Sequence, residues 1–353
     1  MRVVVVGASG NVGTALLRRL AREDQVDAVT GVARRVPGPD AGAPYDGVDW
    51  HAVDVGGPDA VTRLTDVFAG AGAVVHLAWQ IQPSHDRQAL RHTNVTGTAH
   101  VAEAAVRASV PALVVASSVG AYAPGPKDEK VDEDWPVTGV PGSTYSRDKA
   151  DQEALLDNVE DDHPGLRVVR LRPGLIFQRS AASEIARYFI GPLAPLQLLR
   201  LGRLPVVPYD PRLRVQAEHA DDVAEAYTRA VLSDVHGPFN IAADPVLDGA
   251  RVAARYGGRA VRVPLGVLRL GASLSWHARL QPTEPGWVRL AESAPLMSSE
   301  RAERELGWRP RTDALGALEE LLDGMARGSG APAPPLTPRG LTDLRVPGHG
   351  NPY

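Results

Sequence analysis

The 353-residue sequence lacks cysteine altogether, which excludes disulfide bonds, thiolate metal sites, iron–sulfur clusters and cysteine nucleophiles. A reducing compartment is the simplest setting for such a chain, so we expect a cytoplasmic protein. An excess of basic charge is also lacking: the formal net charge is -4 and the pI is near 6.2, so no basic field attracts a nucleic-acid backbone. We therefore expect a small-molecule partner and no nucleic acid.

Long apolar runs are missing as well. Gly7 ends the apolar start of the chain after a few residues, too soon for the core of a signal peptide, and nothing later offers the roughly 18 uninterrupted apolar residues of a membrane span. The two most apolar stretches, 191–208 and 261–280, are interrupted by arginine, histidine or proline, and we expect them to pack within a lobe rather than on a membrane. The histidines form no metal-binding pair at helical spacing, so no metal site is predicted.

The chain otherwise has the composition of a globular protein, with 44% hydrophobic and 23% charged residues. In its first half, short β-branched runs alternate with longer amphipathic stretches, a pattern typical of β-α-β units. We predict an α/β fold: a Rossmann-type doubly wound parallel sheet with a smaller, mostly C-terminal substrate lobe. The predicted strands cover residues 3–6, 28–33, 50–55, 73–77, 112–116, 167–171 and 239–242, and predicted helices cover 14–23 and 314–326.

A glycine-rich turn lies between the first predicted strand and the first predicted helix. Gly7, Gly10 and Gly13 follow the spacing Gly-x-x-Gly-x-x-Gly. Gly7 permits a tight turn, Gly10 lets a phosphate approach the backbone, and Gly13 lets helix and strand pack closely. Because the free N–H groups at a helix N-terminus bind a pyrophosphate well, the motif predicts a bound dinucleotide; an ordinary turn is the alternative.

The end of the second predicted strand distinguishes NADP from NAD. Sites for NAD normally place a carboxylate about 20 residues after the glycines, where it binds the adenosine ribose. Ala33 stands there in this sequence, followed by Arg34 and Arg35, whose guanidinium groups suit a 2'-phosphate. We therefore expect NADP to be preferred, with NAD or two merely solvated arginines as alternatives. Asp54, after the third strand, either accepts a hydrogen bond from adenine or caps the next turn.

A phenol and an ammonium group lie one helical turn apart. Tyr145 and Lys149 are four residues apart and hence on one helix face. A free phenol has a pKa of about 10, and a nearby cation favours the phenolate, as a proton shuttle requires. Lysine is rare in this arginine-rich chain, although an exposed pair on a helix flank is the alternative. Ser118 follows a predicted strand and either bonds a substrate oxygen or caps the next segment.

Taken in order along the chain, these motifs resemble those of the extended short-chain dehydrogenases/reductases, in the NAD-dependent epimerase/dehydratase group. The resemblance implies that Tyr145 is the general acid/base, that Lys149 holds the nicotinamide ribose and lowers the tyrosine pKa, and that Ser118 polarises the reacting oxygen. It covers residues 1 to about 326 and rests on Gly7 to Gly13, Asp54, 76–78, 94–98, Ser117 to Tyr122, Tyr145 to Lys149, 172–174, 219–224, 239–241 and 305–310.

The expected site follows from these motifs together. The catalytic residues are Ser118, Tyr145 and Lys149. The cofactor-binding residues are Gly7, Ser9, Gly10, Asn11, Val12, Gly13, Arg34, Arg35, Asp54, Val55, Leu77, Ala78, Trp79, Asn94, Ser117, Tyr145, Lys149 and Pro173. The residues expected to face the substrate are Trp79, Gln80, Tyr122, Phe177 and Gln178.

Three regions are predicted along the chain. Residues 1–174 would form the NAD(P)-binding Rossmann domain, and residues 175–326 the substrate-binding lobe, interleaved with the last sheet elements. Residues 327–353 are rich in proline and glycine, a composition that cannot repay its ordering entropy by its own burial, so a tail or strap is expected. Similar proteins also lead us to expect a homodimer, although no residue marks its interface.

The substrate stays open at this point. Many nucleotide-sugar enzymes of the group carry an asparagine shortly after the arginine that Arg172 matches, and this chain has none up to Gln178. The departure favours an NAD(P)-dependent oxidoreductase acting on a carbonyl or secondary alcohol. A nucleotide-sugar epimerase or dehydratase with a tightly held, recycled cofactor is one alternative. A catalytically inactive cofactor-sensing regulator is another, against which the complete set of catalytic residues argues.

Overall fold

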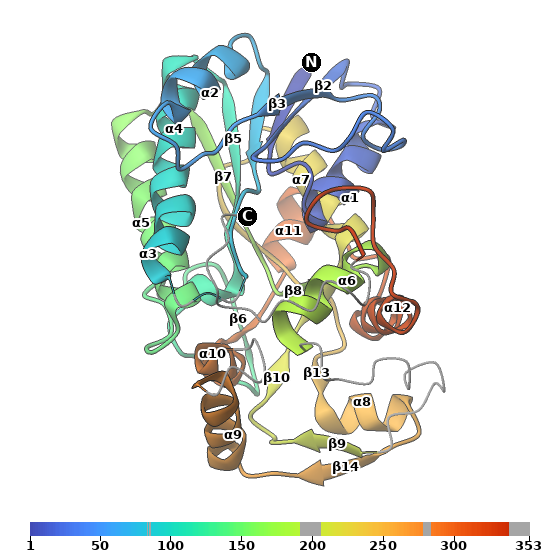
Figure 1. The fold of residues 1–353 in the computed structure, drawn as a ribbon. Helices are drawn as coiled ribbons and strands as arrows, with labels where there is room; N and C mark the ends of the chain where they lie inside the picture. Colours follow the sequence, from blue (N-terminus) through green and yellow to red (C-terminus); the bar gives the residue numbers. More distant parts are fainter. Residues whose placement is uncertain (83, 85, 191–205, 278–283, 339–353) are drawn as a thin grey trace.

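A parallel sheet of seven strands forms the centre of the protein, described by a computed structural model for residues 1–82, 84, 86–190, 206–277 and 284–338 (Figure 1). The strand order is β12-β7-β5-β4-β1-β2-β3, so the predicted Rossmann-type fold is confirmed. The order reverses between β1 and β4, the kind of switch point where open α/β sheets bind ligands. The strands are β1 (Arg2–Val6), β2 (Ala28–Ala33), β3 (Asp49–Ala52), β4 (Ala73–His76), β5 (Ala112–Ala116), β7 (Arg167–Pro173) and β12 (Gly237–Ile241).

Both faces of the sheet are covered by helices. Because side chains alternate along a strand, Val3 and Val5 of β1 join one core cluster, whereas Val4 and Val6 join the other. All four valines are buried, which explains why the central strand is a continuous apolar run. The helices that contribute to the first cluster are α1 (Asn11–Leu20), α7 (Ala220–Leu232) and α11 (Glu300–Glu305). Those of the second are α2 (Ala60–Phe68), α4 (Gly97–Arg107) and α5 (Thr144–Asp162).

Small two-stranded sheets and short helices form the lower end of the molecule in Figure 1. The chain leaves the central sheet after β7 and returns to it with α7 and β12, so the two regions are interleaved. The exact domain boundaries stay a prediction. The remaining strands are β6 (Lys130–Val131), β8 (Leu175–Phe177), β9 (Val206–Tyr209), β10 (Arg214–Val215), β11 (Ala217–His219), β13 (Leu247–Asp248), β14 (Arg259–Arg262) and β15 (Leu296–Met297). The remaining helices are α3 (Arg87–Arg91), α6 (Ala182–Ile185), α8 (Gly249–Arg255), α9 (Leu265–His277), α10 (Pro285–Ser293) and α12 (Ala314–Arg327).

The first part of the proline- and glycine-rich region packs onto the fold. Ala333 and Leu336 are fully buried, and the Ser183 backbone N–H donates to the carbonyl oxygen of Ser329 at 3.2 Å. Residues 329–338 thus lie across the surface as a strap, and 339–353 lie outside the described residues.

The described part of the apolar stretch 261–280 packs inward as expected only in part, at residues such as Leu265 and Trp276, which are buried. Helix α9 covers most of it, and Val267, Leu270 and Leu274 on this helix are exposed. Local sequence could not show this, because burial of an apolar face depends on whether a neighbouring element covers it. Most of the other stretch, 191–208, lies outside the described residues.

Candidate active site

The glycine-rich loop between β1 and α1 forms a cradle at the switch point. Gly7 has a φ of +91°, and a Cβ added there would lie 2.6 Å from the Ala78 nitrogen. A Cβ on Gly13 would lie 2.4 Å from the Gly7 oxygen, so both positions require glycine. At Gly10 the nearest atom to an added Cβ is the Gly7 oxygen at 3.4 Å, so the space above this residue is open to a ligand.

The start of helix α1 fits a pyrophosphate. Gly10 is its N-cap and no side chain caps the first turn, so the backbone N–H groups there are available to an anion. Asn11, predicted to contact cofactor, donates through its side-chain amide to the Ile176 oxygen at 3.1 Å. Its amide therefore ties the loop to β8 instead of pointing at the cradle. Ser9 and Val12 flank the N-cap in the same loop, with Ser9 buried and Val12 half-buried.

The residues expected to contact the adenosine of the cofactor lie after β2 and β3. Arg34 and Arg35 follow this strand and are exposed, whereas Ala33 is buried. The Asp54 carboxylate accepts a hydrogen bond from the Gly56 N–H at 3.0 Å. Asp54 thus has the turn-capping role that was one of its two expected roles.

Ser118 and Tyr145 meet at the carboxyl end of β5, although 27 residues separate them in the sequence. Ser118 caps a short 3-10 helix (Val119–Ala121), and its Oγ accepts from the Gly120 N–H at 3.0 Å. The same side chain lies near Tyr145 in the first turn of α5: a Cβ added to Gly120 would lie 3.4 Å from Ser118 Oγ. A Cβ on Gly120 would lie 2.7 Å from Tyr145 Cε1, so glycine there is what lets the phenol reach the serine.

Lys149 lies one turn further along α5 but does not point at the phenol. Its Nζ donates to the Ala116 oxygen at 2.6 Å and to Gln152 Oε1 at 3.0 Å, and lies 3.4 Å from the centre of the Trp79 ring. Burial raises the pKa of Tyr145 to about 12, although the neighbouring Ser118 side chain acts in the opposite direction. The expected lowering of this pKa by Lys149 is therefore wrong for this arrangement. Burial also holds the pKa of Lys149 well below its usual range.

Aromatic side chains from three segments gather around the phenol. The Tyr145 ring lies 4.7 Å from Trp287 of α10 and 6.2 Å, edge-on, from Trp79 after β4. Phe189 contacts Trp287 in turn, with ring centres 5.0 Å apart. Neither Trp287 nor Phe189 was expected at the site, because neither belongs to a motif and both reach it through tertiary packing alone.

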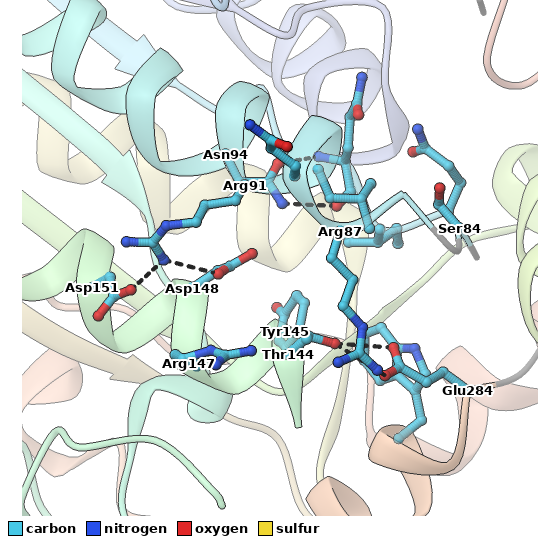
Figure 2. A pocket seen from close by; sticks show the side chains of 16 residues that line it. Ser84, Arg87, Arg91, Asn94, Thr144, Tyr145, Arg147, Asp148, Asp151 and Glu284 are labelled. Carbon is cyan, nitrogen blue, oxygen red and sulfur yellow. Dashed lines mark hydrogen bonds and ion pairs between the residues drawn. The ribbon is translucent and has the colours of Figure 1, made fainter. Parts of the chain in front are cut away.

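A cavity of about 420 Å³ opens beside Tyr145 (Figure 2). Two arginines on its wall are already paired: Arg91 binds Asp148 at 3.2 Å and also Asp151, and Arg87 binds Glu284 at 3.1 Å. Amides, charged groups and apolar side chains thus share the wall. Its lining residues are Gln80, Ile81, Gln82, Ser84, Arg87, Gln88, Leu90, Arg91, Asn94, Thr144, Tyr145, Arg147, Asp148, Asp151, Glu284 and Trp287.

Comparison with known proteins agrees with this geometry. The profile of the NAD dependent epimerase/dehydratase family matches residues 3–242. The chain belongs to this family. It is accordingly an NAD(P)-dependent enzyme of the dehydrogenase, epimerase or dehydratase kind.

The proteins that this chain resembles are named for different substrates. An L-arabinose 1-dehydrogenase (NAD(P)(+)) of Haloferax volcanii is 32% identical over 204 residues, which are 53% of this chain and 74% of that protein. A decarboxylating sterol-4-alpha-carboxylate 3-dehydrogenase of Saccharomyces cerevisiae is 31% identical over 134 residues, 37% of each chain. The structure of a Thermus thermophilus UDP-glucose 4-epimerase with NAD matches with a TM-score of 0.68 at 24% identity, over 93% of this chain and 99% of that one. This last similarity shows the fold.

Beneath the site, this epimerase/dehydratase family member carries a buried charged network. Both carboxylate oxygens of Glu153 accept from Arg172, at 2.8 and 2.9 Å, and the Ser117 hydroxyl also donates to this carboxylate. Ser117 was expected to contact the cofactor, but its hydroxyl points into the network. Tyr122 was expected to face the substrate, yet it is fully buried between Arg172 and Asn240. A buried guanidinium group requires hydrogen-bonding and charged partners. This requirement, and not the position of Ser117 and Tyr122 after β5, determines where their hydroxyl groups point.

Two further expected substrate contacts point elsewhere. Gln178 is buried, and its amide donates to the backbone oxygen and to the side chain of Asn11, at 2.7 and 2.6 Å. Phe177 packs against the apolar clusters that contain Leu321 and Leu247. Both expectations are wrong, because β8 directs these side chains toward the glycine loop and α12. Of the expected set, Gln80 lines the cavity and Trp79 stacks beside Tyr145.

The other expected cofactor residues lie along the same edge of the sheet. Leu77 and Ala78 follow β4, and the Leu77 N–H donates to the Val6 oxygen at 2.7 Å. Asn94 binds both the N–H and the oxygen of Gln80, at 2.7 and 3.0 Å, and so shapes the cavity wall. The residues not yet placed are Val55, which is buried below α4 with its oxygen bonded to His100, and Pro173, which ends β7.

Proposed function

We propose that the protein is an NADP-preferring oxidoreductase that interconverts a carbonyl and a secondary alcohol, with Tyr145 as the general acid/base. The observation that carries this proposal is the Tyr145 phenol, which lines the cavity and packs together with Ser118 against Gly120 at the carboxyl end of β5. The cofactor would be held by the loop at Gly7 to Gly13 and by Lys149. When bound, it would supply or accept the hydride.

The raised pKa of the Tyr145 phenol supports a reaction in the direction of carbonyl reduction. Because its pKa is about 12, Tyr145 is protonated near neutral pH and can donate a proton to the oxygen of a carbonyl whose carbon accepts a hydride. The Ser118 Oγ lies next to the phenol and would orient the same oxygen. Trp79 and Trp287 shield the phenol from water, which strengthens these polar contacts.

The cavity wall supports a substrate without a diphosphate. A diphosphate would need several available cations, but of the three arginines on the wall Arg87 and Arg91 are bound to Glu284, Asp148 and Asp151. Arg147 alone of the three has no ion pair with a residue that the structure describes. The amides of Gln80 and Gln82 and the ring of Trp287 suit a neutral, hydroxylated or cyclic compound instead. The similarity to sugar and sterol dehydrogenases supports the same reading, whereas the epimerase-like fold keeps a nucleotide-sugar epimerase or dehydratase as the second candidate.

Replacement of Tyr145 by phenylalanine tests the mechanism. The wild-type protein is mixed with NADPH and a panel of sugars, cyclic ketones and aldehydes, and the absorbance of the reduced nicotinamide is followed. For any compound that is reduced, Tyr145→Phe should lower kcat by roughly 10²- to 10⁴-fold, the range expected for loss of general acid catalysis. The dissociation constant of NADPH should stay within about twofold, because the phenol is not its main anchor. Turnover retained by this variant would remove Tyr145 from the mechanism.

The same experiment separates the two candidate functions. Stoichiometric loss of NADPH with a carbonyl compound supports an oxidoreductase. If no compound is reduced but a UDP-sugar is isomerised without net cofactor change, the second candidate is correct and the proposed function fails.

Replacement of Arg34 and Arg35 by alanine tests the NADP preference. Two lost charge-assisted contacts to a 2'-phosphate should weaken NADPH binding by roughly 10- to 100-fold and leave NADH within about twofold. Arg22→Ala, which removes an exposed guanidinium at the far end of α1, is the matched control. If the affinities for NADPH and NADH fall equally, these side chains do not bind the 2'-phosphate.

A further inference from the structure

An apolar stripe runs along the surface of helix α9. Val267, Leu270 and Leu274 are 59%, 59% and 63% exposed, and their spacing places them on one face of the helix. Val206 of β9 and Val261 of β14 are also exposed, at 56% and 43%, on strands that pair with each other at the same end of the molecule (Figure 1). Single exposed apolar residues are ordinary, but several on one helix face point to a partner.

Positive charge accompanies this stripe. Residues 249–277 contain five arginines and no aspartate or glutamate, in a chain whose net charge is -4. Two of these arginines are paired, Arg255 with Glu319 and Arg269 with Glu292. The other three, Arg251, Arg259 and Arg262, are exposed and form no ion pair with any residue that the structure describes. Residues 249–277 are thus both apolar and basic.

The stripe lies on the same lobe as the cavity. Helix α9 packs against α10, and Trp287 of α10 contacts the Tyr145 ring. In Figure 1 the two helices stand together at the lower end, away from α2 and the amino terminus. A partner bound along α9 would therefore lie next to the element that walls the substrate cavity.

We propose that this end of the molecule is a docking surface for an anionic lipid bilayer. We call it the α9 surface and define it by Val267, Leu270, Leu274, Arg259 and Arg262. The aliphatic side chains would enter the boundary between headgroups and acyl chains, while the guanidinium groups bind lipid phosphates and carboxylates. None of the helices in the described ranges is long and apolar enough to cross a membrane, so contact would be confined to the surface.

Charge argues against a second copy of this chain as the occupant. A twofold interface brings the same patch of each copy together, so it would gather the unpaired Arg259 and Arg262 of both copies, and the residues that define the surface supply no carboxylate to neutralise them. An anionic bilayer offers the opposite charge and an apolar layer at once. The inference does not depend on the proposed function, because none of the residues of the α9 surface touches the catalytic tyrosine or the glycine cradle.

Vesicle co-sedimentation tests the proposal. The full chain is mixed with vesicles of phosphatidylcholine alone or of phosphatidylcholine with phosphatidylserine, at low and at high salt. We expect binding only to the anionic vesicles, with release at high salt. Replacing Arg259 and Arg262 by glutamine should weaken partitioning about thirtyfold, since each basic residue near a charged membrane contributes about one kcal/mol. Leu270→Ser with Leu274→Ser should also weaken it at least tenfold, by loss of buried apolar area.

Controls keep the result interpretable. Arg22→Gln with Arg311→Gln removes the same amount of charge elsewhere on the surface and should leave partitioning nearly unchanged. Binding of NADPH, measured on each variant, shows that the fold is intact and reports independently on the proposed function. No binding to anionic vesicles, or equal binding by all variants, overturns the proposal. So does a dimer, seen by light scattering, that the leucine variant abolishes, because the stripe would then be an interface between copies.

Discussion

Glu153→Gln should destabilise the protein more than any surface charge substitution. Glu153 is 2% exposed and accepts from Arg172, which is 3% exposed, and from Arg170 at 3.1 Å. Glutamine keeps the shape of the side chain but leaves the Arg172 charge buried without its counterion. Breaking a buried ion pair in this way costs roughly 3–5 kcal/mol, a large share of the free energy of unfolding of an ordinary protein.

The pH dependence of stability should change in the same variant. Burial alone would raise the pKa of Glu153, but the hydrogen bonds and charge of Arg172 outweigh it and hold this pKa at about 2, below the ordinary 4.5. A carboxyl with a lowered pKa stabilises the fold above its unfolded pKa and loses this contribution as the pH falls toward the folded value. Wild type should therefore lose roughly 3 kcal/mol between about pH 4.5 and pH 2 through this group, and Glu153→Gln should lack that part of the loss.

Urea unfolding followed by circular dichroism measures both effects, near neutral pH and along an acid series. Asp157→Asn is the matched control, because Asp157 also binds Arg170 but its side chain is 63% exposed. This substitution should cost less than about 1 kcal/mol, as exposed ion pairs do. If Glu153→Gln costs no more than the control, or keeps the full acid dependence, the buried network does not stabilise the fold as argued.

Two glycine substitutions separate the cofactor cradle from the proton-transfer site. Gly10→Ala adds a Cβ that meets no atom closer than 3.4 Å, so the melting temperature should stay the same. The NADPH dissociation constant should rise at least tenfold, because the Cβ would occupy the space of the pyrophosphate. Unchanged NADPH affinity would refute a pyrophosphate above this residue. Gly120→Ala places a Cβ 2.7 Å from the Tyr145 ring, so kcat should fall roughly 100-fold with NADPH affinity nearly unchanged. Gly38→Ala, where the added Cβ meets nothing within 4 Å, is the control for both assays, and a kcat for Gly120→Ala equal to this control would contradict the tight contact.

Strand positions were predicted closely because local signals define them. The strands at 28–33 and 112–116 have the predicted bounds, and β1, β4 and β7 differ from their predicted bounds by one or two residues. The inner strands β1 and β5 are apolar runs that are buried on both faces, which is visible in the sequence itself. Helix α1 begins at Asn11 instead of residue 14, because its first turn belongs to the glycine loop and carries no apolar periodicity.

Side-chain direction was predicted less well. Ser118 and Tyr145 both lie against Gly120 at the carboxyl edge of the parallel sheet, and their catalytic roles stay a prediction. Ser117, next to Ser118, points the other way, into the charges of Glu153 and Arg172. Adjacent residues thus differ in role according to which buried group each one contacts, and no local sequence pattern predicts which group that is.

The amino-acid sequence alone determined the order of strands and helices, the glycine cradle and the spacing of the phenol and the ammonium group, because these depend on backbone geometry over a few residues. The tertiary structure decided the burial that raises the pKa of Tyr145, the aromatic wall from Trp287 and the exposure of the α9 surface. Desolvation and packing depend on which distant segments come together, so these properties exist only once the chain has folded.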